Sequence, residues 1–97
     1  MTYSLHRGAE VDLLEAARFY RQEGGVKLAN RFLDEFERVA KLLVEFPGIG
    51  MPADDLRRVH PLHDFPYSVI YRDVGGQIRI LVVRGHLRDP EYGESRR

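Results

Sequence analysis

The sequence contains no cysteine, which excludes disulfide bonds and thiolate metal ligands and removes any argument for export to an oxidising compartment. No segment holds the roughly twenty consecutive apolar residues that a helix needs to span a bilayer. The first residues also lack a basic and then apolar secretory pattern, because His6, Arg7, Glu10 and Asp12 interrupt it. We therefore expect a soluble, cytoplasmic protein without a membrane segment.

Lysine is nearly absent, since Lys27 and Lys41 are its only occurrences. The formal net charge is zero, but residues 57–97 contain 8 arginines against 5 acidic residues, a local excess of 3. An excess this small excludes a strongly basic nucleic-acid binder, so any attraction for phosphate would be local. Acidic helices next to basic strands would explain the same imbalance without any function.

A chain of 97 residues with 43% hydrophobic residues is long enough for one core, and we expect a single domain over residues 1–97. No repeat, low-complexity tract or internal linker divides the sequence. The stretch from Phe65 to Tyr92 contains the clearest pattern, because two apolar runs there are separated only by the glycine pair at 75–76.

Both runs have the composition of β-strands. Residues 68–73 alternate, with Val69 and Tyr71 on one face and Ser68, Ile70 and Arg72 on the other. The glycine pair supplies the positive φ angles of a tight hairpin turn. Residues 77–85 follow, and this strand is expected to be central and covered on both sides. Its alternation places three residues on one face: Ile78, Ile80 and Val82.

Two amphipathic helices are expected before these strands. The first runs from about residue 9 to 23 and ends at Gly24-Gly25; its apolar stripe is built around Val11, Leu14 and Ala17. Its exposed positions are predicted to be Glu10, Asp12, Glu15, Arg18, Arg21 and Glu23. The second starts near residue 26 and stops at Pro47-Gly48. So short a link predicts an antiparallel helical hairpin that covers a sheet.

The remaining segments complete an α+β fold. Residues 2–6 are expected to form an N-terminal strand, residues 48–53 a loop, and residues 55–60 an edge strand or irregular segment. The expected architecture is therefore a helical hairpin packed on a small antiparallel β-sheet. The core is expected to include Phe32, Phe36, Ile80 and Val82.

Several segments together resemble the RelE/ParE superfamily of bacterial type II toxins. They are A-E-V-D-L-L-E-A-A-R-F-Y (9–20), F-P-G-I-G-M-P (46–52), L-R-R (56–58), F-P-Y-S-V-I-Y (65–71) and V-R-G-H-L-R-D-P-E-Y (83–92). They cover nearly the whole chain in the order of the family. The resemblance implies a compact α+β toxin without a cofactor, which forms a hetero-oligomer with a cognate, ParD-like antitoxin whose tail wraps it.

Two activities occur in that superfamily. ParE-like members inhibit DNA gyrase without established catalytic residues, whereas RelE-like members cut mRNA in the ribosomal A site. The long helical hairpin and the acidic first helix resemble the ParE branch, and the lysine-rich site of RelE-type nucleases has no match here. We therefore expect a ParE-like gyrase inhibitor. The alternatives are a ribosome-dependent mRNA endoribonuclease and an inactive member that only binds its antitoxin.

If the protein were a metal-independent ribonuclease, the candidate catalytic residues would be Arg58, Arg84, His86, Arg88 and Tyr92. Cleavage through the 2′-hydroxyl needs a base, an acid and cations near the phosphate. Histidine suits either proton role because its pKa lies near physiological pH, and the planar arginine fork can bind two phosphate oxygens. Tyr92 would stack on a base or donate a proton.

If the protein acts by binding, the same region supplies the partner-binding candidates Arg57, Arg58, Arg84, His86 and Arg88. Each also has a purely structural explanation: His86 could bond backbone, Arg84 could lie over the sheet, and Tyr92 could pack down as part of the tail. Arg57 and Arg58 would point to opposite faces of an extended segment, so at most one would serve a shared site.

His60 and His63 lie three residues apart beside Asp64, a spacing that some metal sites use. No further ligand cluster accompanies them, so no metal site is expected.

Overall fold

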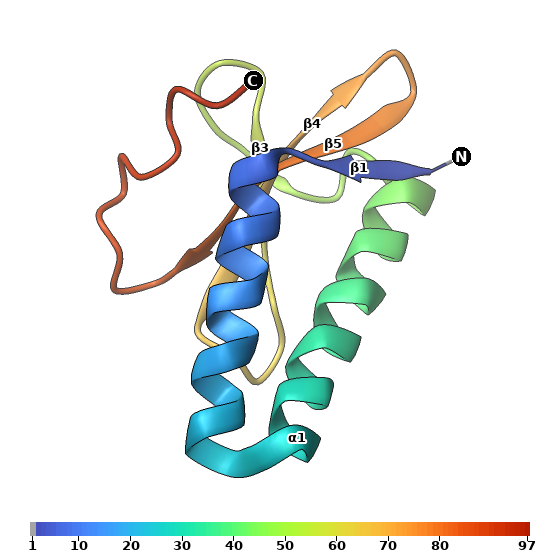
Figure 1. Ribbon diagram of the computed structural model, residues 1–97. Helices are drawn as coiled ribbons and strands as arrows, with labels where there is room; N and C mark the ends of the chain where they lie inside the picture. Colours follow the sequence, from blue (N-terminus) through green and yellow to red (C-terminus); the bar gives the residue numbers. More distant parts are fainter. Residues whose placement is uncertain (1) are drawn as a thin grey trace.

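The computed structural model describes residues 2–97 and shows a helical layer packed on a five-stranded sheet (Figure 1). The elements follow in the order β1 (Tyr3–Leu5), α1 (Arg7–Glu45), β2 (Met51–Pro52), β3 (Arg58–Pro61), β4 (Tyr67–Val74) and β5 (Gln77–Gly85). The strand order is β1-β5-β4-β3-β2, which places β5 between β1 and β4. The α+β class and the inner position of β5 are confirmed.

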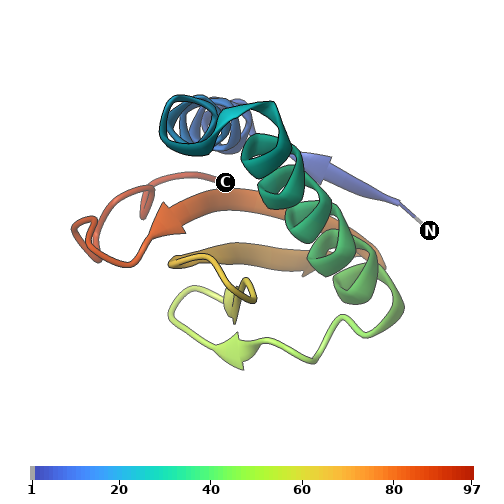
Figure 2. The same cartoon turned by 90° about the horizontal axis from the view of Figure 1, so that it is seen from below.

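The two predicted helices are the two arms of α1. The helix begins at Arg7, where the Nδ1 atom of His6 accepts a hydrogen bond from the backbone N–H of Gly8 at 2.9 Å. Gly25 alone leaves helical geometry, with φ 81° and ψ −174°, a conformation that glycine adopts readily because it has no Cβ. The arms run antiparallel from that residue and lie on one side of the sheet (Figures 1 and 2). The expected separate helices are therefore one element, Arg7–Glu45, with a reversal at a single residue.

The prediction of a fully antiparallel sheet is wrong at one pair. β1 runs parallel to β5, with Tyr3 opposite Ile78 and Leu5 opposite Ile80, while the other three strand pairs are antiparallel. The sheet is therefore mixed, because the long α1 excursion between β1 and the remaining strands lets β1 enter alongside β5 in the same direction.

The segment between α1 and β4 also differs from expectation. Two residues of the expected loop, Met51–Pro52, form the edge strand β2, so β3 is not at the edge. β3 begins only at Arg58, because Asp55 and Leu56 have positive φ angles of 61° and 59° that are incompatible with a strand.

A β-bulge changes which face the end of β5 presents. Ile70 pairs with Val82, but the next residue of β4, Tyr71, pairs with Ile80, so Leu81 is an extra residue on β5. Ile78 and Ile80 consequently face α1, whereas Val82 packs with Leu81 and Ile70 on the opposite face. The prediction that Val82 shares a face with Ile80 is wrong for this reason.

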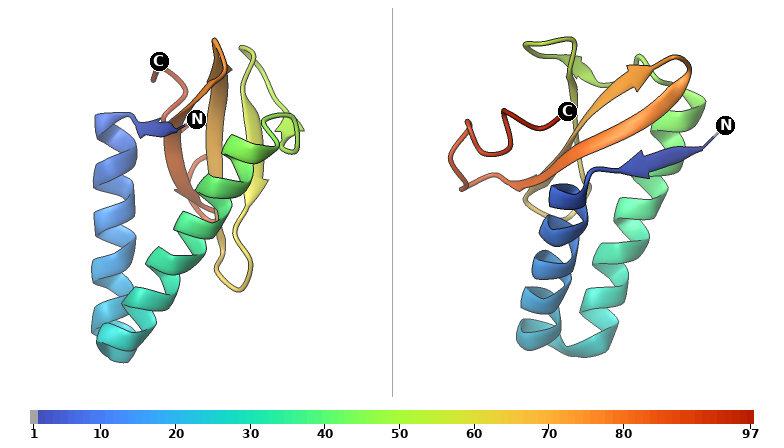
Figure 3. Two further views of the ribbon diagram at one scale, coloured as in Figure 1. Left: turned by 90° about the vertical axis from the view of Figure 1, so that its right-hand side faces the viewer. Right: turned by 45° about the horizontal axis from the view of Figure 1, so that its top comes forward.

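The main core lies between α1 and the sheet. Phe32 is completely buried, and its ring centroid lies 5.2–5.3 Å from the rings of Tyr20, Phe65 and Tyr67. The expected burial of Phe32, Phe36, Ile80 and Val82 is confirmed. The opposite face, called here the outer face, is covered in part by residues 86–97, the C-terminal tail. Figure 3 shows this tail leaving β5 and turning back along the molecule, so that the C-terminus lies near the chain that leads into β3.

Candidate functional site

The end of β5 and the C-terminal tail bring four of the predicted site residues together. Arg84 donates a hydrogen bond from Nη1 to the carbonyl oxygen of Pro90 at 2.9 Å. The His86 Nε2 atom lies 3.0 Å from the Ser68 hydroxyl oxygen. The guanidinium carbon of Arg88 lies 4.2 Å from the ring centroid of Tyr92, a cation–π arrangement. Each of these polar groups therefore has a partner within the chain.

The other two predicted residues, Arg57 and Arg58, contact different parts of the molecule. Arg58 donates from Nη1 to the Gly50 carbonyl oxygen at 2.8 Å, on the loop before β2. Arg57 is 8% exposed and donates from Nη2 to three carbonyl oxygens of the tail. These are the oxygens of Gly93, Glu94 and Arg96, at 3.2, 2.6 and 2.6 Å. The six candidate residues therefore do not converge on one point.

Asp12 is central to this region, and its predicted position on the exposed side of the helix is wrong. It was expected to be exposed on the first helical arm, but it is only 5% exposed. The residues expected in the buried stripe, Val11 and Leu14, are 48% and 67% exposed instead. The buried side is formed by Ala9, Asp12 and Ala16. The available signal of Asp12 burial was the small residue one helical turn before it and the small residue one turn after it. Small side chains on the same face let the helix approach the sheet closely.

The Asp12 carboxylate bonds one strand and two residues of the tail. Its Oδ2 atom accepts from the backbone N–H of Val83 at 3.1 Å and from Arg96 Nη1 at 2.7 Å. Its Oδ1 atom accepts from the Tyr92 hydroxyl at 2.5 Å. Arg96 also donates to the Leu81 carbonyl oxygen at 3.1 Å. We call Asp12, Arg57, Tyr92 and Arg96 the C-terminal latch.

The need for this latch follows from the short length of β1. β1 pairs with β5 only as far as Ile80, so beyond that point no strand covers the same edge of β5. Buried backbone groups there must find other partners. The carboxylate of Asp12 and the guanidinium of Arg96 supply them, to the N–H of Val83 and the carbonyl of Leu81 respectively. The latch thus closes the open edge of β5 and fixes the tail at the same time.

The latch also determines the protonation of its members. The hydrogen bond to Asp12, together with burial, raises the pKa of the Tyr92 phenol above its usual value. Burial lowers the pKa of Arg96, but its hydrogen bonds to Asp12 and Tyr92 outweigh burial and raise it. Tyr92 is therefore held as a hydrogen-bond donor to Asp12, and Arg96 as a cation.

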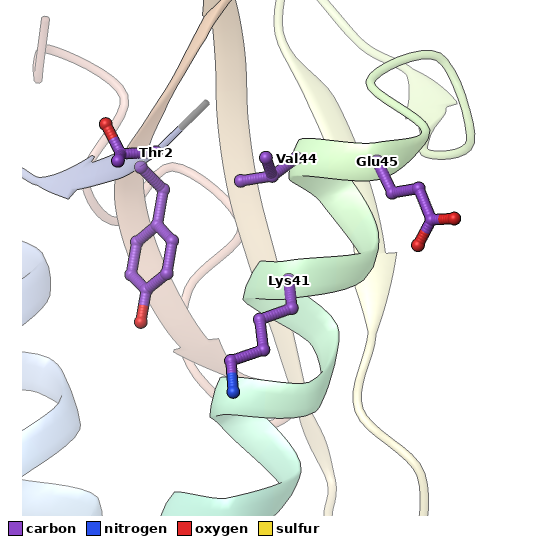
Figure 4. Close-up of a pocket in the computed structure, with 5 residues that line it drawn as sticks. Thr2, Lys41, Val44 and Glu45 are labelled. Atoms are coloured by element: carbon purple, nitrogen blue, oxygen red, sulfur yellow. The ribbon is translucent and has the colours of Figure 1, made fainter.

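A second feature is an apolar groove of about 720 Å³ between β1 and the last turns of α1. It is lined by Thr2, Tyr3, Lys41, Val44 and Glu45. Figure 4 shows Val44 extending from α1 toward Thr2, Lys41 extending downward from the preceding turn of α1, and the carboxylate of Glu45 pointing away. The groove runs beside β1, an edge strand of the sheet.

The histidine pair does not gather further ligands. His60 Nδ1 lies 2.8 Å from the Pro61 carbonyl oxygen, and His63 Nε2 lies 3.4 Å from Asp64 Oδ1. Within residues 2–97, no three His, Cys, Asp or Glu side chains are placed to hold a metal ion. Over the same residues, no helix is both long and apolar enough to cross a membrane.

Comparison with known proteins gives consistent matches. A family model described as the ParE toxin of the type II toxin-antitoxin system parDE matches residues 3–90. Toxin ParE1 of Caulobacter vibrioides is 28% identical over 81 residues, which cover 84% of each chain. A solved structure titled "Chromosomal ParDE TA system from P. aeruginosa" contains a chain with a TM-score of 0.77 and 26% identity, covering 88% of this chain and 95% of that one.

Proposed function

Because the chain belongs to the ParE toxin family of type II toxin-antitoxin systems, we propose that it blocks DNA gyrase by binding and is neutralised by a cognate antitoxin. The observation that carries this proposal is the match of the family over residues 3–90, which includes every strand and both arms of α1. Gyrase as target would place the toxin in the cytoplasm.

The contacts of the candidate residues support binding rather than catalysis. Cleavage of RNA would need a base, an acid and cations around one phosphate. Arg58 lies opposite Tyr71 in the β3–β4 register, whereas Arg84 lies opposite Ser68, three residues along β4, or roughly 10 Å away. The Tyr92 hydroxyl donates its hydrogen bond to the Asp12 carboxylate. The side chains therefore do not form a convergent catalytic set.

The turn that follows β5 is the proposed contact surface for gyrase. Leu87 is fully exposed, and it lies between His86 and Arg88, which are also exposed. An exposed apolar residue beside cationic side chains is typical of a protein–protein interface, and arginine is enriched at the residues that contribute most to binding. The intramolecular bonds of Arg84 and His86 hold this turn in a defined conformation before any partner binds.

The apolar groove beside β1 is the proposed site of the antitoxin. An edge strand can pair with an extended segment, and an apolar groove accepts the apolar face of an amphipathic one. The antitoxin segment is expected to be disordered when free and to fold on binding. The complex would then be a hetero-oligomer in which the groove and the turn after β5 serve different partners.

The test of the proposed function compares two targets. Purified toxin should inhibit supercoiling of plasmid DNA by gyrase, and a cognate antitoxin should restore it. Messenger RNA should stay intact when the toxin is induced. Transcripts cleaved on the ribosome, with cleavage abolished by His86→Ala, would show an endoribonuclease instead. Harmless expression without antitoxin, together with uninhibited supercoiling, would show an inactive member.

The groove assignment has its own test. Val44→Glu introduces a charge into the groove and should weaken antitoxin binding by about tenfold or more, because a buried charge without a partner is unfavourable. Inhibition of supercoiling should not change. Val26→Glu is a matched control, since Val26 is 55% exposed near the reversal of α1. Equal loss of antitoxin affinity in both variants would contradict the assignment.

A further inference from the structure

Two arginines face each other on the outer face near the β4–β5 turn. Arg72 of β4 is the direct cross-strand partner of Arg79 of β5. Directly opposite residues of an antiparallel pair have Cβ atoms about 5 Å apart, and like charges in that position destabilise the sheet. Because the pairing of Arg72 with Arg79 weakens the sheet, a function that uses both charges would explain it.

No carboxylate neutralises this pair. Within residues 2–97, neither Arg72 nor Arg79 has a carboxylate oxygen within 4 Å, and Arg79 donates a long hydrogen bond to the Ser4 hydroxyl at 3.4 Å. The neighbouring Asp73 accepts a hydrogen bond from the N–H of Gly76 in the hairpin turn. The two guanidinium groups therefore keep most of their donors free.

The arginine pair lies beside a hollow of about 360 Å³. The residues that line it come from β1, β4, β5 and the end of the tail: Ser4, Arg72, Val74, Gln77, Ile78, Arg79 and Arg97. The charged and polar groups among them are three guanidinium groups, a hydroxyl and a carboxamide, and no acidic side chain is included. Arg97 is held near the hollow by an ion pair with Asp55 at 3.1 Å.

The surroundings of the hollow respond to this positive charge. Burial lowers the pKa of His6, and the positive charges of Arg79 and Arg96 lower it further. Burial likewise lowers the pKa of Arg57, and Arg97 adds to this effect, with a smaller contribution from Arg72. Burial is the main cause of both shifts, and the neighbouring arginines act in the same direction, whereas Asp12 for His6 and Asp55 and Glu94 for Arg57 oppose it.

We propose that Arg72 and Arg79, assisted by Ser4 and Arg97, bind phosphate groups of the backbone of duplex DNA. Arginine forks bind phosphate oxygens in pairs, and neutral hydroxyl and amide donors commonly complete such sites. Donors that approach from several chain segments suit a tetrahedral phosphate better than a planar carboxylate. The donors around the hollow are groups that bind phosphate oxygens, and phosphate contacts carry no sequence information, so we expect the binding to be independent of sequence.

The choice of DNA among phosphate-bearing partners rests on the proposed function, because gyrase holds duplex DNA while it acts. The net charge of the whole chain is zero, so long-range attraction to DNA is absent. Contact by two arginines gives weak binding with a logarithmic salt slope of about −2. The site therefore acts on DNA that is already held near the toxin by a larger partner.

The experiment measures fluorescence anisotropy of a short labelled duplex with the full-length toxin, as a function of salt. The double variant R72Q/R79Q should bind about tenfold more weakly at low salt, and its salt slope should fall toward zero. The control R18Q/R21Q removes the same charge from exposed positions of α1 and should bind as the wild type does, within about twofold. Thermal unfolding should show R72Q/R79Q at least as stable as the wild type, because the repulsion between the arginines is removed.

Three results would overturn the inference. The first is that the wild type shows no salt-dependent binding of the duplex. The second is that R72Q/R79Q and R18Q/R21Q lose the same amount of affinity. The third is that poly-glutamate displaces the labelled duplex at a lower concentration than unlabelled duplex does, which would show an acidic-peptide site. A parallel supercoiling assay separates this inference from the proposed function. Inhibition of gyrase without direct DNA binding defeats only the DNA site, whereas DNA binding without inhibition defeats only the gyrase proposal.

Discussion

The two faces of the sheet are stabilised in different ways. On the face toward α1, the buried side chains of the core are apolar and aromatic and pack in direct contact, and the ring of Phe32 lies among three other rings. On the outer face, within residues 2–97, the buried cluster consists of Ile70, Leu81 and Val82, with Val59 and Tyr92 packed at its margin. The helix-side face provides a continuous core, and the outer face depends on a few polar contacts.

The tail also leaves a hollow against the outer face. A cavity of about 650 Å³ lies between the C-terminal tail and β3–β4, bordered by both acidic and basic side chains. The tail is held across it by hydrogen bonds from Arg57 and by the contacts of Asp12. Because a few polar contacts hold the tail, we expect it to open while the helix-side core keeps the fold intact.

The largest expected effect is on the helix-side face. Phe32→Ala should lower the free energy of unfolding by about 3–5 kcal/mol, because it leaves a cavity among three other rings. Urea unfolding measures the change. Phe19→Ala is the control, since Phe19 is 50% exposed although its ring contacts Tyr20, and it should cost about 1 kcal/mol or less. Similar losses in the two variants would contradict the description of the core.

The next effect is on the latch. Asp12→Ala should lower the free energy of unfolding by about 3 kcal/mol, because it leaves the partly buried guanidinium of Arg96 and the N–H of Val83 without their acceptor. A double-mutant cycle with Arg96→Met should give a coupling energy above about 1 kcal/mol. Glu10→Ala, at an exposed position of the same helical arm, is the control and should change the free energy of unfolding little. No coupling between Asp12 and Arg96 would argue against the latch.

A smaller and local effect is expected at Arg57. Arg57→Met should lower the free energy of unfolding by about 1–2 kcal/mol, because the three tail carbonyls lose one donor but can bond water instead. Hydrogen exchange should accelerate for tail amides and stay unchanged for the amides of β4 and β5. Equal acceleration in both regions would show that the tail and the core do not open separately.

The smallest expected effect is a loss of stability at alkaline pH. Burial raises the pKa of Tyr20, Tyr67 and Tyr71, and the hydrogen bond to Asp12 raises that of Tyr92. The folded state therefore favours the protonated phenols, and this stability is fully present below the unfolded pKa of about 10 and is lost as pH rises through the folded values. Phenolate absorbance followed with circular dichroism measures the loss. Tyr92→Phe should remove only the contribution of the outer face, and an unchanged profile in that variant would exclude it.

Within α1, the helix-side face could be predicted only for the second arm, because its pattern is local and regular, whereas the stripe predicted around Val11 and Leu14 in the first arm was wrong. The three- and four-residue steps through Phe32, Phe36 and Leu43 specify one face of a helix, and all three residues are buried. The alternation in β4 also correctly placed Val69 and Tyr71 on one face, which in the structure is the helix side. In β5 the same reasoning failed after Ile80, because one bulged residue reverses every following side chain.

The candidate site could be predicted only in part. The sequence indicated the cluster at the end of β5, because a change from apolar to polar residues marks the end of a strand. The burial of Asp12 was missed although Ala9 and Ala16 were a local signal of it, and its partners Tyr92 and Arg96 could not be identified because they lie 80 and 84 residues away. The pairing of Arg72 with Arg79 likewise follows from strand register, which the hairpin turn determines.

The most direct test of the proposed contact surface at the end of β5 is a gyrase supercoiling assay on one pair of double variants. The account predicts that Arg84→Ala/Arg88→Ala, at and after the end of β5, raises the toxin concentration needed for half inhibition by about tenfold or more while the protein stays folded. Arg18→Ala/Arg21→Ala, on the exposed side of α1, should inhibit as the wild type does. Full inhibition by the first variant, or an equal loss in the second, would contradict the account.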